Sequence, residues 1–293
     1  MNTSTSLKVA KGQSPWSIAL AKLFKNKMAI VALVVIIILI GLALFAPLIT
    51  KFDPDKIDLT NRHQPPGSVN LLGTDDYGRD VFTRLIFGTR ASLLVGFVST
   101  SISVTIGVLL GALSGYYGGW IDVIVMRLVD IFMCFPFFLM AIVLAAILGP
   151  SIYTVMIVSG VLSWPSLARM VRAEVLTLKK REFVEAARAL GLNVPSMIFT
   201  HVLPNVFSVI IVYATLGIAG GILGEAGLSY LGLGVKQPQP SWGNMLSSAQ
   251  SMAALMFYPW LWIPPGIMIF VTTLSINIFG DALRDTLDPK QKK

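Results

Sequence analysis

Few residues of this chain could perform chemistry inside a membrane, and their positions limit what that chemistry is. Asp122, Arg127, Asp130, Arg169 and Glu225 border long apolar runs, and none falls clearly at the centre of one. Ion-coupled carriers keep such groups at mid-membrane depth. Arg127 and Asp130 are three residues apart, on one face of an expected helix, and can pair. The pattern favours interfacial charge pairs and helix-end charges, with an ion-coupled secondary transporter as the alternative from another class.

Histidine, cysteine and nucleotide-binding motifs do not support an enzyme. His63 and His201 fall in loops expected on opposite sides of a membrane, so they cannot share a metal or catalytic site. Cys134 is the single cysteine, which excludes an internal disulfide, and its apolar neighbours predict a small buried side chain. No Gly-Lys dipeptide occurs, and hence no Walker A loop for ATP phosphates. We expect no catalytic residue, cofactor or metal in this chain.

One polar segment between two apolar segments has a pattern suited to contact with another protein. Residues 181–190 are rich in helix formers. Glu182 and Glu185 near the start and Arg188 near the end complement the helix dipole. Gly191 is the expected left-handed residue after the helix. The sequence therefore predicts a short helix that ends in a glycine turn.

A second short helix is expected to follow, capped by Asn193 with Pro195 in its first turn. Small residues in the first helix and its turn would let another protein approach the backbone closely. We call residues 173–204 the handle. Its candidate contact residues are Glu182, Glu185, Ala186, Ala187, Gly191, Leu203 and Pro204.

Hydropathy indicates that the handle joins membrane-spanning helices. The chain has 293 residues, 55% of them apolar and 13% charged, whereas globular domains average about 25% charged. Five runs lack Asp, Glu, Lys and Arg, and each exceeds the ~18 residues that indicate a span. The runs are 28–50, 91–121, 131–168, 189–224 and 237–280. The third should break at Gly149-Pro150 and the fifth at the cluster of Pro238, Pro240 and Gly243.

The predicted fold is an all-α membrane protein with six transmembrane helices and both termini cytoplasmic. The helices are predicted at residues 28–49, 92–116, 124–148, 152–172, 205–227 and 260–281. Segments 1–27, 169–188 and 284–293 carry fifteen Lys and Arg, against seven in the loops assigned to the other side. Cytoplasmic loops carry the excess of Lys and Arg, so the handle is expected in the cytoplasm. Residues 15–25 have the pattern of an interfacial amphipathic helix.

The handle resembles a motif of a known transporter family. Glu185-Ala186-Ala187, then Gly191, then Leu203-Pro204, is similar in type and spacing to the EAA loop of ATP-binding-cassette (ABC) importer permeases. In that family the loop inserts into a groove of an ATP-hydrolysing subunit. His201 stands where the general pattern has an aliphatic residue, and the peptide-transporter branch tolerates histidine there.

Other segments resemble the C-type permease of dipeptide and oligopeptide importers. These segments are 72–84, 88–93, 225–234, 240–243 and 280–289. The resemblance covers about residues 16–290, essentially the whole chain. Within it, the outer segment motif consists of Gly73, Thr74, Asp75, Gly78, Arg79 and Asp80.

The resemblance implies a type I ABC importer permease fold and a machine of several subunits. The chain would form the path for di- and oligopeptides with a homologous B-type permease, in the inner membrane of a bacterial cell. Two ABC ATPase subunits would bind ATP and Mg²⁺, and an extracytoplasmic peptide-binding protein would deliver cargo. No nucleic-acid partner is expected. The same machine carrying nickel or a nickel chelate is the alternative, because nickel importers share this branch.

The domain organisation follows from the same reasoning. We expect an N-terminal interfacial helix at 1–27, a first span with an extracytoplasmic segment at 28–87, a core at 88–281 that includes the handle, and a tail at 282–293. Thr74 could cap a collar helix on the outer membrane surface, with Val81 and Leu85 on its apolar face. Direct docking of the binding protein on that segment is the alternative.

Overall fold

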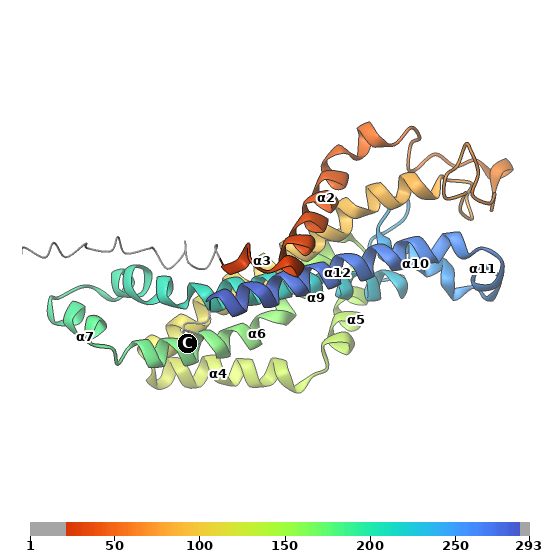
Figure 1. Ribbon diagram of the computed structural model, residues 1–293. Helices are drawn as coiled ribbons and strands as arrows, with labels where there is room; N and C mark the ends of the chain where they lie inside the picture. The colour runs from red at the N-terminus through yellow and green to blue at the C-terminus, as the bar shows by residue number, and fades with distance from the viewer. Residues whose placement is uncertain (1–21, 288–293) are drawn as a thin grey trace, which may run out of the picture.

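The computed structural model describes residues 22–287, which form a bundle of long helices that run between two ends (Figure 1). Five helices are long and apolar enough to cross a membrane, and a sixth span results if one bent pair is counted as one. The five are α2 (Lys27–Ile49), α3 (Val81–Tyr117), α6 (Ile152–Leu178), α9 (Leu203–Tyr230) and α12 (Pro259–Leu287). The bent pair is α4 (Gly119–Cys134) and α5 (Phe137–Leu148). The short helices are η1 (Leu59–Asn61), α7 (Glu182–Ala189), α8 (Val194–Ser196), η2 (Met197–Val202), α10 (Trp242–Leu246), η3 (Ser247–Gln250) and α11 (Met252–Phe257).

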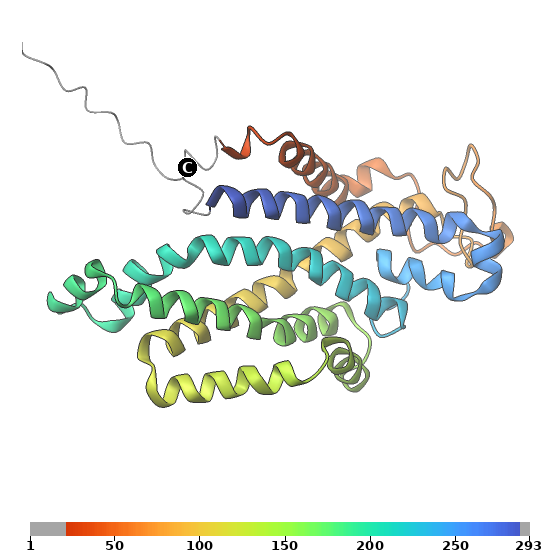
Figure 2. The same ribbon diagram turned by 60° about the horizontal axis from the view of Figure 1, so that its bottom comes forward.

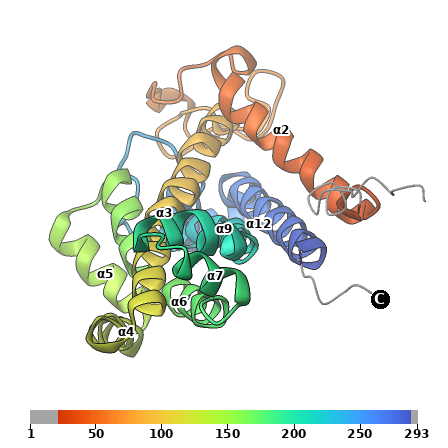
Figure 3. The same cartoon turned by 90° about the vertical axis from the view of Figure 1, so that its left-hand side faces the viewer.

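Helix α3 lies at the centre of the bundle and packs most extensively against α6, with α9 on another side (Figure 3). Close approach depends on glycines that face α6. A Cβ atom on Gly111 would lie 2.5 Å from the Ala168 carbonyl oxygen, and one on Gly107 would lie 3.0 Å from the Trp164 carbonyl oxygen. Small residues let membrane helices pack backbone to backbone, so this stripe sets the distance between α3 and α6.

The second span begins eleven residues earlier than predicted, at Val81 instead of residue 92. Asp80 is the N-cap, and its carboxylate accepts a hydrogen bond from the Thr83 amide at 2.8 Å. The predicted collar helix is therefore wrong, because the residues from Thr74 to Asp80 form a loop and the helix continues without interruption to Tyr117. At ~1.5 Å per residue, α3 is roughly 55 Å long and exceeds a ~30 Å hydrocarbon layer.

The third predicted helix, residues 124–148, is broken in two. Phe135 and Pro136 separate α4 from α5, and the two helices are bent by 89°. Proline lacks an amide hydrogen and clashes with the preceding turn, which favours the break. Cys134 consequently ends α4, where it is exposed, and its predicted burial is wrong. The predicted break at Gly149-Pro150 is confirmed.

The other boundaries are close to the predicted ones. Helix α9 ends at Tyr230 and α12 begins at Pro259, which confirms the break around Pro238, Pro240 and Gly243. Helices α6 and α12 each run six residues further than predicted, to Leu178 and Leu287. Their ends extend beyond the apolar runs. The interfacial helix predicted at 15–25 lies mostly outside the described residues.

The two ends of the bundle carry different segments (Figures 1 and 2). The handle, with α7, projects from one end, while the segment from Thr50 to Asp80 and the helices α10 and α11 lie at the other. The first residues of α2 and the last of α12 point toward the handle end (Figure 2). This arrangement agrees with both termini and the handle lying on one side, and the cytoplasmic assignment of that side stays a prediction.

Candidate functional site

The handle has the local structure that its sequence predicts. Helix α7 spans Glu182–Ala189, and Gly191 follows it with a φ of 80°. The Gly191 amide donates to the Arg188 carbonyl at 3.0 Å and closes the turn. Glycine adopts this left-handed conformation without strain. A Cβ atom at Gly191 would meet nothing within 4 Å, so the turn is open to another molecule.

The second half of the handle also follows the prediction. The Asn193 side chain accepts a hydrogen bond from the Ser196 amide at 2.9 Å, and Pro195 lies in the first turn of α8. Residues Met197–Val202 form a π-helix, which the sequence did not indicate. This segment leads directly into α9, which Leu203 and Pro204 begin.

Helix α7 has one buried face and one exposed face. Val184 and Ala187, three residues apart, are buried in a cluster with Tyr116 at the end of α3. Glu182, Glu185 and Ala186 are exposed. The structure therefore separates the small residues of the predicted contact set. Ala186 and Gly191 are accessible, whereas Ala187 serves packing within the chain, because its spacing from Val184 places both on the inner face.

Three apolar side chains at the handle are exposed and were not among the predicted contact residues. Phe183 is 43% exposed, Leu190 81% and Phe199 63%. They lie close in sequence to Glu182, Glu185, Ala186 and Gly191 at the projecting end of the bundle. Phe183 lies in the charged part of the handle, where a large apolar side chain was the signal in the sequence, whereas Leu190 and Phe199 fall in the uncharged run 189–224, which gave no such signal. Such exposed apolar groups rimmed by polar residues indicate a protein contact.

The base of the handle is held to the bundle by several polar contacts. The Lys179 ammonium donates to the Tyr116 carbonyl, and the Arg188 guanidinium carbon lies 6.0 Å from the centre of the Tyr116 ring. Arg172 donates two hydrogen bonds to the Asp122 carboxylate, at 2.5 and 2.6 Å. These contacts link α7 and the end of α6 to α3 and α4. A displacement of the handle would therefore be transmitted to these spans.

The other candidate charges form pairs as well. The Asp130 carboxylate lies 3.0 Å from Arg169 Nη2 and 3.9 Å from Arg127 Nη1, which confirms the predicted i, i+3 pair. Glu225 is buried in α9, and its carboxylate accepts hydrogen bonds from Ser92 Oγ at 2.9 Å and Ser229 Oγ at 2.7 Å. Each carboxylate in this group is thus held by a specific partner.

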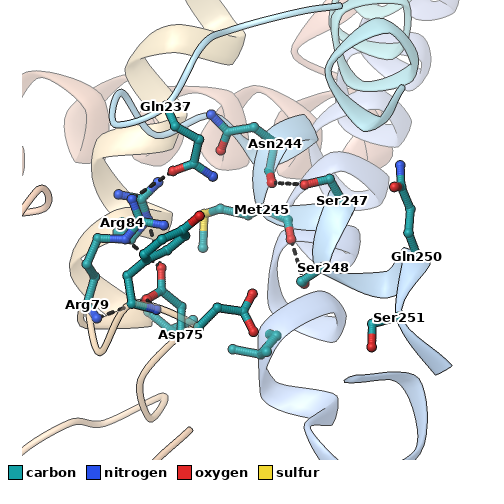
Figure 4. A pocket seen from close by; sticks show the side chains of 14 residues that line it. Asp75, Arg79, Arg84, Gln237, Asn244, Met245, Ser247, Ser248, Gln250 and Ser251 are labelled. Carbon is teal, nitrogen blue, oxygen red and sulfur yellow. Dashed lines mark hydrogen bonds and ion pairs between the residues drawn. The ribbon is translucent and has the colours of Figure 1, made fainter. Parts of the chain in front are cut away.

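The outer segment motif forms a buried polar cluster that ties two loops to the start of α3 (Figure 4). Arg79 Nε donates to Asp75 Oδ2 at 2.7 Å, and its Nη1 donates to Gln237 Oε1 at 2.7 Å. Arg84, 2% exposed, donates to the carbonyls of Pro54 at 2.8 Å and Pro238 at 3.1 Å. The arginines therefore connect residues near 54 with residues near 238.

The remaining residues of this motif shape the loop. Asp80 caps α3, and the Thr74 hydroxyl donates to the Asn61 carbonyl. Gly73 and Gly78 have φ values of 73° and 72°, which favour glycine. Arg79 and Arg84 border a cavity of about 310 Å³ at this end of the bundle (Figure 4). Both guanidinium groups donate hydrogen bonds to other residues of this chain. The geometry assigns the motif a structural role in holding the loops.

Comparison with protein families matches two parts of the chain. Residues 107–293 match the binding-protein-dependent transport system inner membrane component. Residues 14–66 match the N-terminal transmembrane domain of oligopeptide transport permease C.

Curated relatives resemble the chain over nearly its whole length. A dipeptide transport system permease protein of Alkalihalophilus pseudofirmus is 44% identical, across 95% of this chain and 91% of the relative. An oligopeptide transport system permease protein of Bacillus subtilis is 39% identical, across 97% and 92%. A glutathione transport system permease protein of Pectobacterium atrosepticum is 38% identical, across 96% and 93%.

Solved structures share the fold at low sequence identity. The chain resembles an inward-facing structure of the MetNI methionine ABC transporter with a TM-score of 0.54 and 19% identity, covering 71% of this chain and 97% of that one. An amino acid ABC transporter structure gives a TM-score of 0.53 at 16% identity, covering 70% and 94%. With the family match and these relatives, the chain belongs to the binding-protein-dependent transport system inner membrane components, as a permease subunit of an ABC importer.

Proposed function

We propose that this chain is one of two homologous permeases of an ABC importer for di- and oligopeptides. The relatives described above are named for dipeptide, oligopeptide and glutathione transport, which favours peptides over nickel as the cargo. A homologous permease would complete the path, and an extracytoplasmic binding protein would deliver the peptide. The assembly would lie in the inner membrane of a bacterial cell.

The observation that carries the proposal is the two-faced geometry of the handle. Its exposed face offers Glu185, Ala186 and Gly191 beside the apolar Phe183 and Leu190, while Ala187 and Val184 anchor the other face. An ATPase groove of matching shape would bury the exposed apolar side chains. Two ATPase subunits would bind ATP and Mg²⁺, and hydrolysis would occur there and not in this chain.

Coupling would proceed through the contacts at the base of the handle. When the ATPases close, the force on α7 would reach α3 through Tyr116 and α4 through the Arg172–Asp122 pair. Rigid packing between α3 and α6 would move both helices together. Alternating access needs two arrangements of packed helices. A rotation of α3 and α6 as one rigid body would supply them.

The test is transport by the complete importer in proteoliposomes. The expected result is uptake of a radiolabelled dipeptide that requires the binding protein, and that requires ATP on the side of the membrane where the ATPase subunits lie. This uptake should persist when ion gradients are collapsed. Uptake by this chain alone, driven by a proton or sodium gradient, would instead establish the secondary transporter. ATP-driven uptake of nickel and not of peptide would show that the cargo is nickel, while the assignment as an ABC importer would stand.

A further inference from the structure

The first span contains a proline that leaves one backbone carbonyl without its usual partner. Helix α2 continues through Pro47 without interruption to Ile49. In an α-helix the amide of residue 47 would donate to the carbonyl of Ala43, but proline has no amide hydrogen. Ala43 lies seven residues inside the end of the apolar run 28–50, where lipid and not water surrounds the chain. This carbonyl therefore needs a donor from another part of the protein.

An arginine of the second span supplies that donor. Arg90 on α3 donates from Nε to the Ala43 carbonyl, and from Nη2 to the Leu44 carbonyl at 2.9 Å. Arg90 is the last charged residue before the apolar run 91–121, and an arginine in such a position usually extends toward water and the lipid head groups. Two of its nitrogen atoms are instead bonded to the backbone of α2. A guanidinium group suits this task, because its donors form a planar fork that can reach two neighbouring carbonyls at once.

The other prolines inside long helices have no such donor. Pro165 lies in α6, and Pro264 and Pro265 lie in α12. Among residues 22–287, no side chain donates a hydrogen bond to the carbonyl four residues before any of these three prolines. The contact at Pro47 is therefore specific to the pair α2 and α3, and is not a general consequence of a proline within a span.

The inner face of α2 contacts the rest of the bundle mostly through small side chains. Beyond Leu39, toward the end opposite the handle, its buried residues are Ala43 and Ala46. Figure 1 shows that this part of α2 rises away from α12. In lipid, apolar side chains gain little from contact with one another, so close packing and hydrogen bonds decide which helices associate. The two hydrogen bonds from Arg90 are therefore the specific attachment of this part of α2.

A second arginine of α3 holds the chain where it leaves α2. Arg84, six residues before Arg90, donates to the Pro54 carbonyl at 2.8 Å. The two arginines thus bond backbone carbonyls on both sides of the end of α2, at residues 43–44 and at residue 54. Because the acceptors belong to the main chain, these bonds fix its path directly. The end of α2, the start of the segment 50–80 and the first turns of α3 therefore form one unit.

We propose that Arg90 is a positioning residue that attaches the first span to the second through the carbonyl freed by Pro47, so that α2 and the segment after it move together with α3 during transport. The inference rests on the proposed function, because the movement is that of the transport cycle. Arg90 acts through the backbone of α2 and not through contact with the cargo.

The main test compares the loss of the arginine with and without the proline. Arg90→Met removes every donor but keeps a long side chain, and Pro47→Ala returns an amide that can donate to Ala43 along the helix. In the complete importer, Arg90→Met should lower ATP-driven dipeptide uptake about tenfold, as expected for the loss of hydrogen bonds from a charged group. In the Pro47→Ala background the same change should lower uptake less than about twofold, because the two sites are coupled. An equal loss in both backgrounds would overturn the inference, as would wild-type uptake by Arg90→Met alone.

Two further variants separate this attachment from a general effect of the substitutions. Pro264→Ala in α12 restores an amide at a place where no arginine bonds, so it should not rescue Arg90→Met. Arg90→Lys keeps a charged donor but loses the fork, so its uptake should lie between that of the wild type and that of Arg90→Met. If Arg90→Met fails to assemble, the yield of assembled importer becomes the measured quantity in the same comparison. Rescue of that yield by Pro47→Ala alone supports the attachment, whereas rescue by Pro264→Ala as well, or by neither, contradicts it.

Movement of α2 together with α3 is tested by the distance between two spin labels. The labels are placed by Leu48→Cys on α2 and Leu94→Cys on α3, two exposed positions, in a Cys134→Ser background with the accessible cysteines of the other subunits replaced. With Arg90 present, the distance should be the same in the nucleotide-free and the ATP-bound importer, and with Arg90→Met its distribution should broaden.

A distance that changes between the two states while Arg90 is present would show that the two helices move separately, and would overturn the inference. This distance does not depend on the cargo. Absence of peptide uptake by the wild-type importer would therefore refute the proposed function, whereas a changing distance in an importer that carries peptide would refute only the attachment by Arg90.

Discussion

At the scale of single residues, the handle shows how backbone conformation and exposure divide a short motif. Gly191 takes a positive φ, and its α-carbon faces open space. Ala186 and Ala187 are adjacent in sequence and only about 100° apart around α7, yet Ala186 is exposed and Ala187 is buried. Substitutions at these positions should therefore separate contact with an ATPase from stability of the permease.

Gly191→Asp should uncouple transport while the permease remains in the membrane. The side chain strains the left-handed turn by roughly 1 kcal/mol, and its carboxylate enters the exposed face. Co-purification of the ATPase and peptide uptake should both fall at normal permease levels. Gly191→Asn is the control, because Asn is nearly isosteric with Asp, tolerates a positive φ and adds no charge. This variant should retain more transport activity than Gly191→Asp.

Gly232 supplies a second control, because it has a φ of 78° and equally open surroundings at the opposite end of α9. Gly232→Asp should leave ATPase binding unchanged. Loss of binding in both Asp variants would mean that turn strain, and not the position of Gly191, is responsible. Wild-type binding with Gly191→Asp would mean that the handle is only a connector.

Ala186→Asp and Ala187→Asp should give opposite phenotypes. Ala187 is 6% exposed among apolar side chains, so a carboxylate there lacks a partner and should lower permease levels by several-fold, at a cost of about 3 kcal/mol. Ala186→Asp should keep normal levels and reduce ATPase co-purification. Quantitative immunoblots of membranes, together with the amount of ATPase recovered, would distinguish the two. Equal permease levels for both variants would contradict the two-faced description of α7.

At the scale of elements, the contact between α3 and α6 depends on the absence of side chains. Gly111 approaches the backbone of Ala168, and Gly115 approaches Val175 and the Arg172 carbonyl. The outer loops depend instead on buried arginines that bond across the chain. The two regions thus use different interactions to position the same long helix.

Gly111→Val should separate α3 from α6. The new Cβ atom would lie 2.5 Å from the Ala168 carbonyl oxygen, so the helices must move apart. Overpacking of this kind typically costs about 1–3 kcal/mol or more. The expected result is a lower thermal midpoint for the detergent-solubilised importer, whereas Gly41→Val, in open surroundings, should have no such effect. An unchanged midpoint for Gly111→Val would refute the close packing.

Asp75→Asn should loosen the outer loops. Asp75 is the carboxylate beside Arg79, which is 5% exposed, and beside Arg84, which is 2% exposed. Removing its charge leaves two buried guanidinium groups with less compensation, a change that typically costs about 3–5 kcal/mol. Limited proteolysis from the outer side should become faster near residues 54 and 238. Asp53→Asn, at an exposed position, should not alter the digestion pattern.

At the scale of the whole molecule, the handle and the outer segment occupy opposite ends of the bundle. The excess of Lys and Arg predicts that the handle end is cytoplasmic. Accessibility of introduced cysteines can test this orientation. Cys134 is the one cysteine in the sequence, so a Cys134→Ser background is free of thiols.

In that background, Gly67→Cys at the outer segment should react with a membrane-impermeant maleimide in intact spheroplasts. Leu190→Cys at the handle, where the native side chain is 81% exposed, should react only after the membrane is permeabilised. The reverse pattern would invert the topology and with it the assignment of the ATPase side. Labelling of both Gly67→Cys and Leu190→Cys in intact cells would mean that the helices between these two positions do not cross the membrane as described.

Local chemistry was sufficient for part of this structure. Apolar runs located the spans because hydrocarbon excludes charges over a fixed thickness. Helix formers, Asn193 and Gly191 located the handle helices because capping and positive φ are local preferences. The fold type and the importer family could also be expected from motifs spread along the whole chain.

Tertiary contacts decided the rest, because they join residues that are distant in sequence. Pro136 ends a helix while Pro165 lies within α6, and only the surrounding packing distinguishes them. At the start of helix α3, Val81 packs against Ala254 and Leu261 at the end of the bundle opposite the handle. The inward direction of Ala187 likewise arises only when α7 packs against the ends of α3 and α6 and the start of α9, since no single segment contains the residues of that cluster.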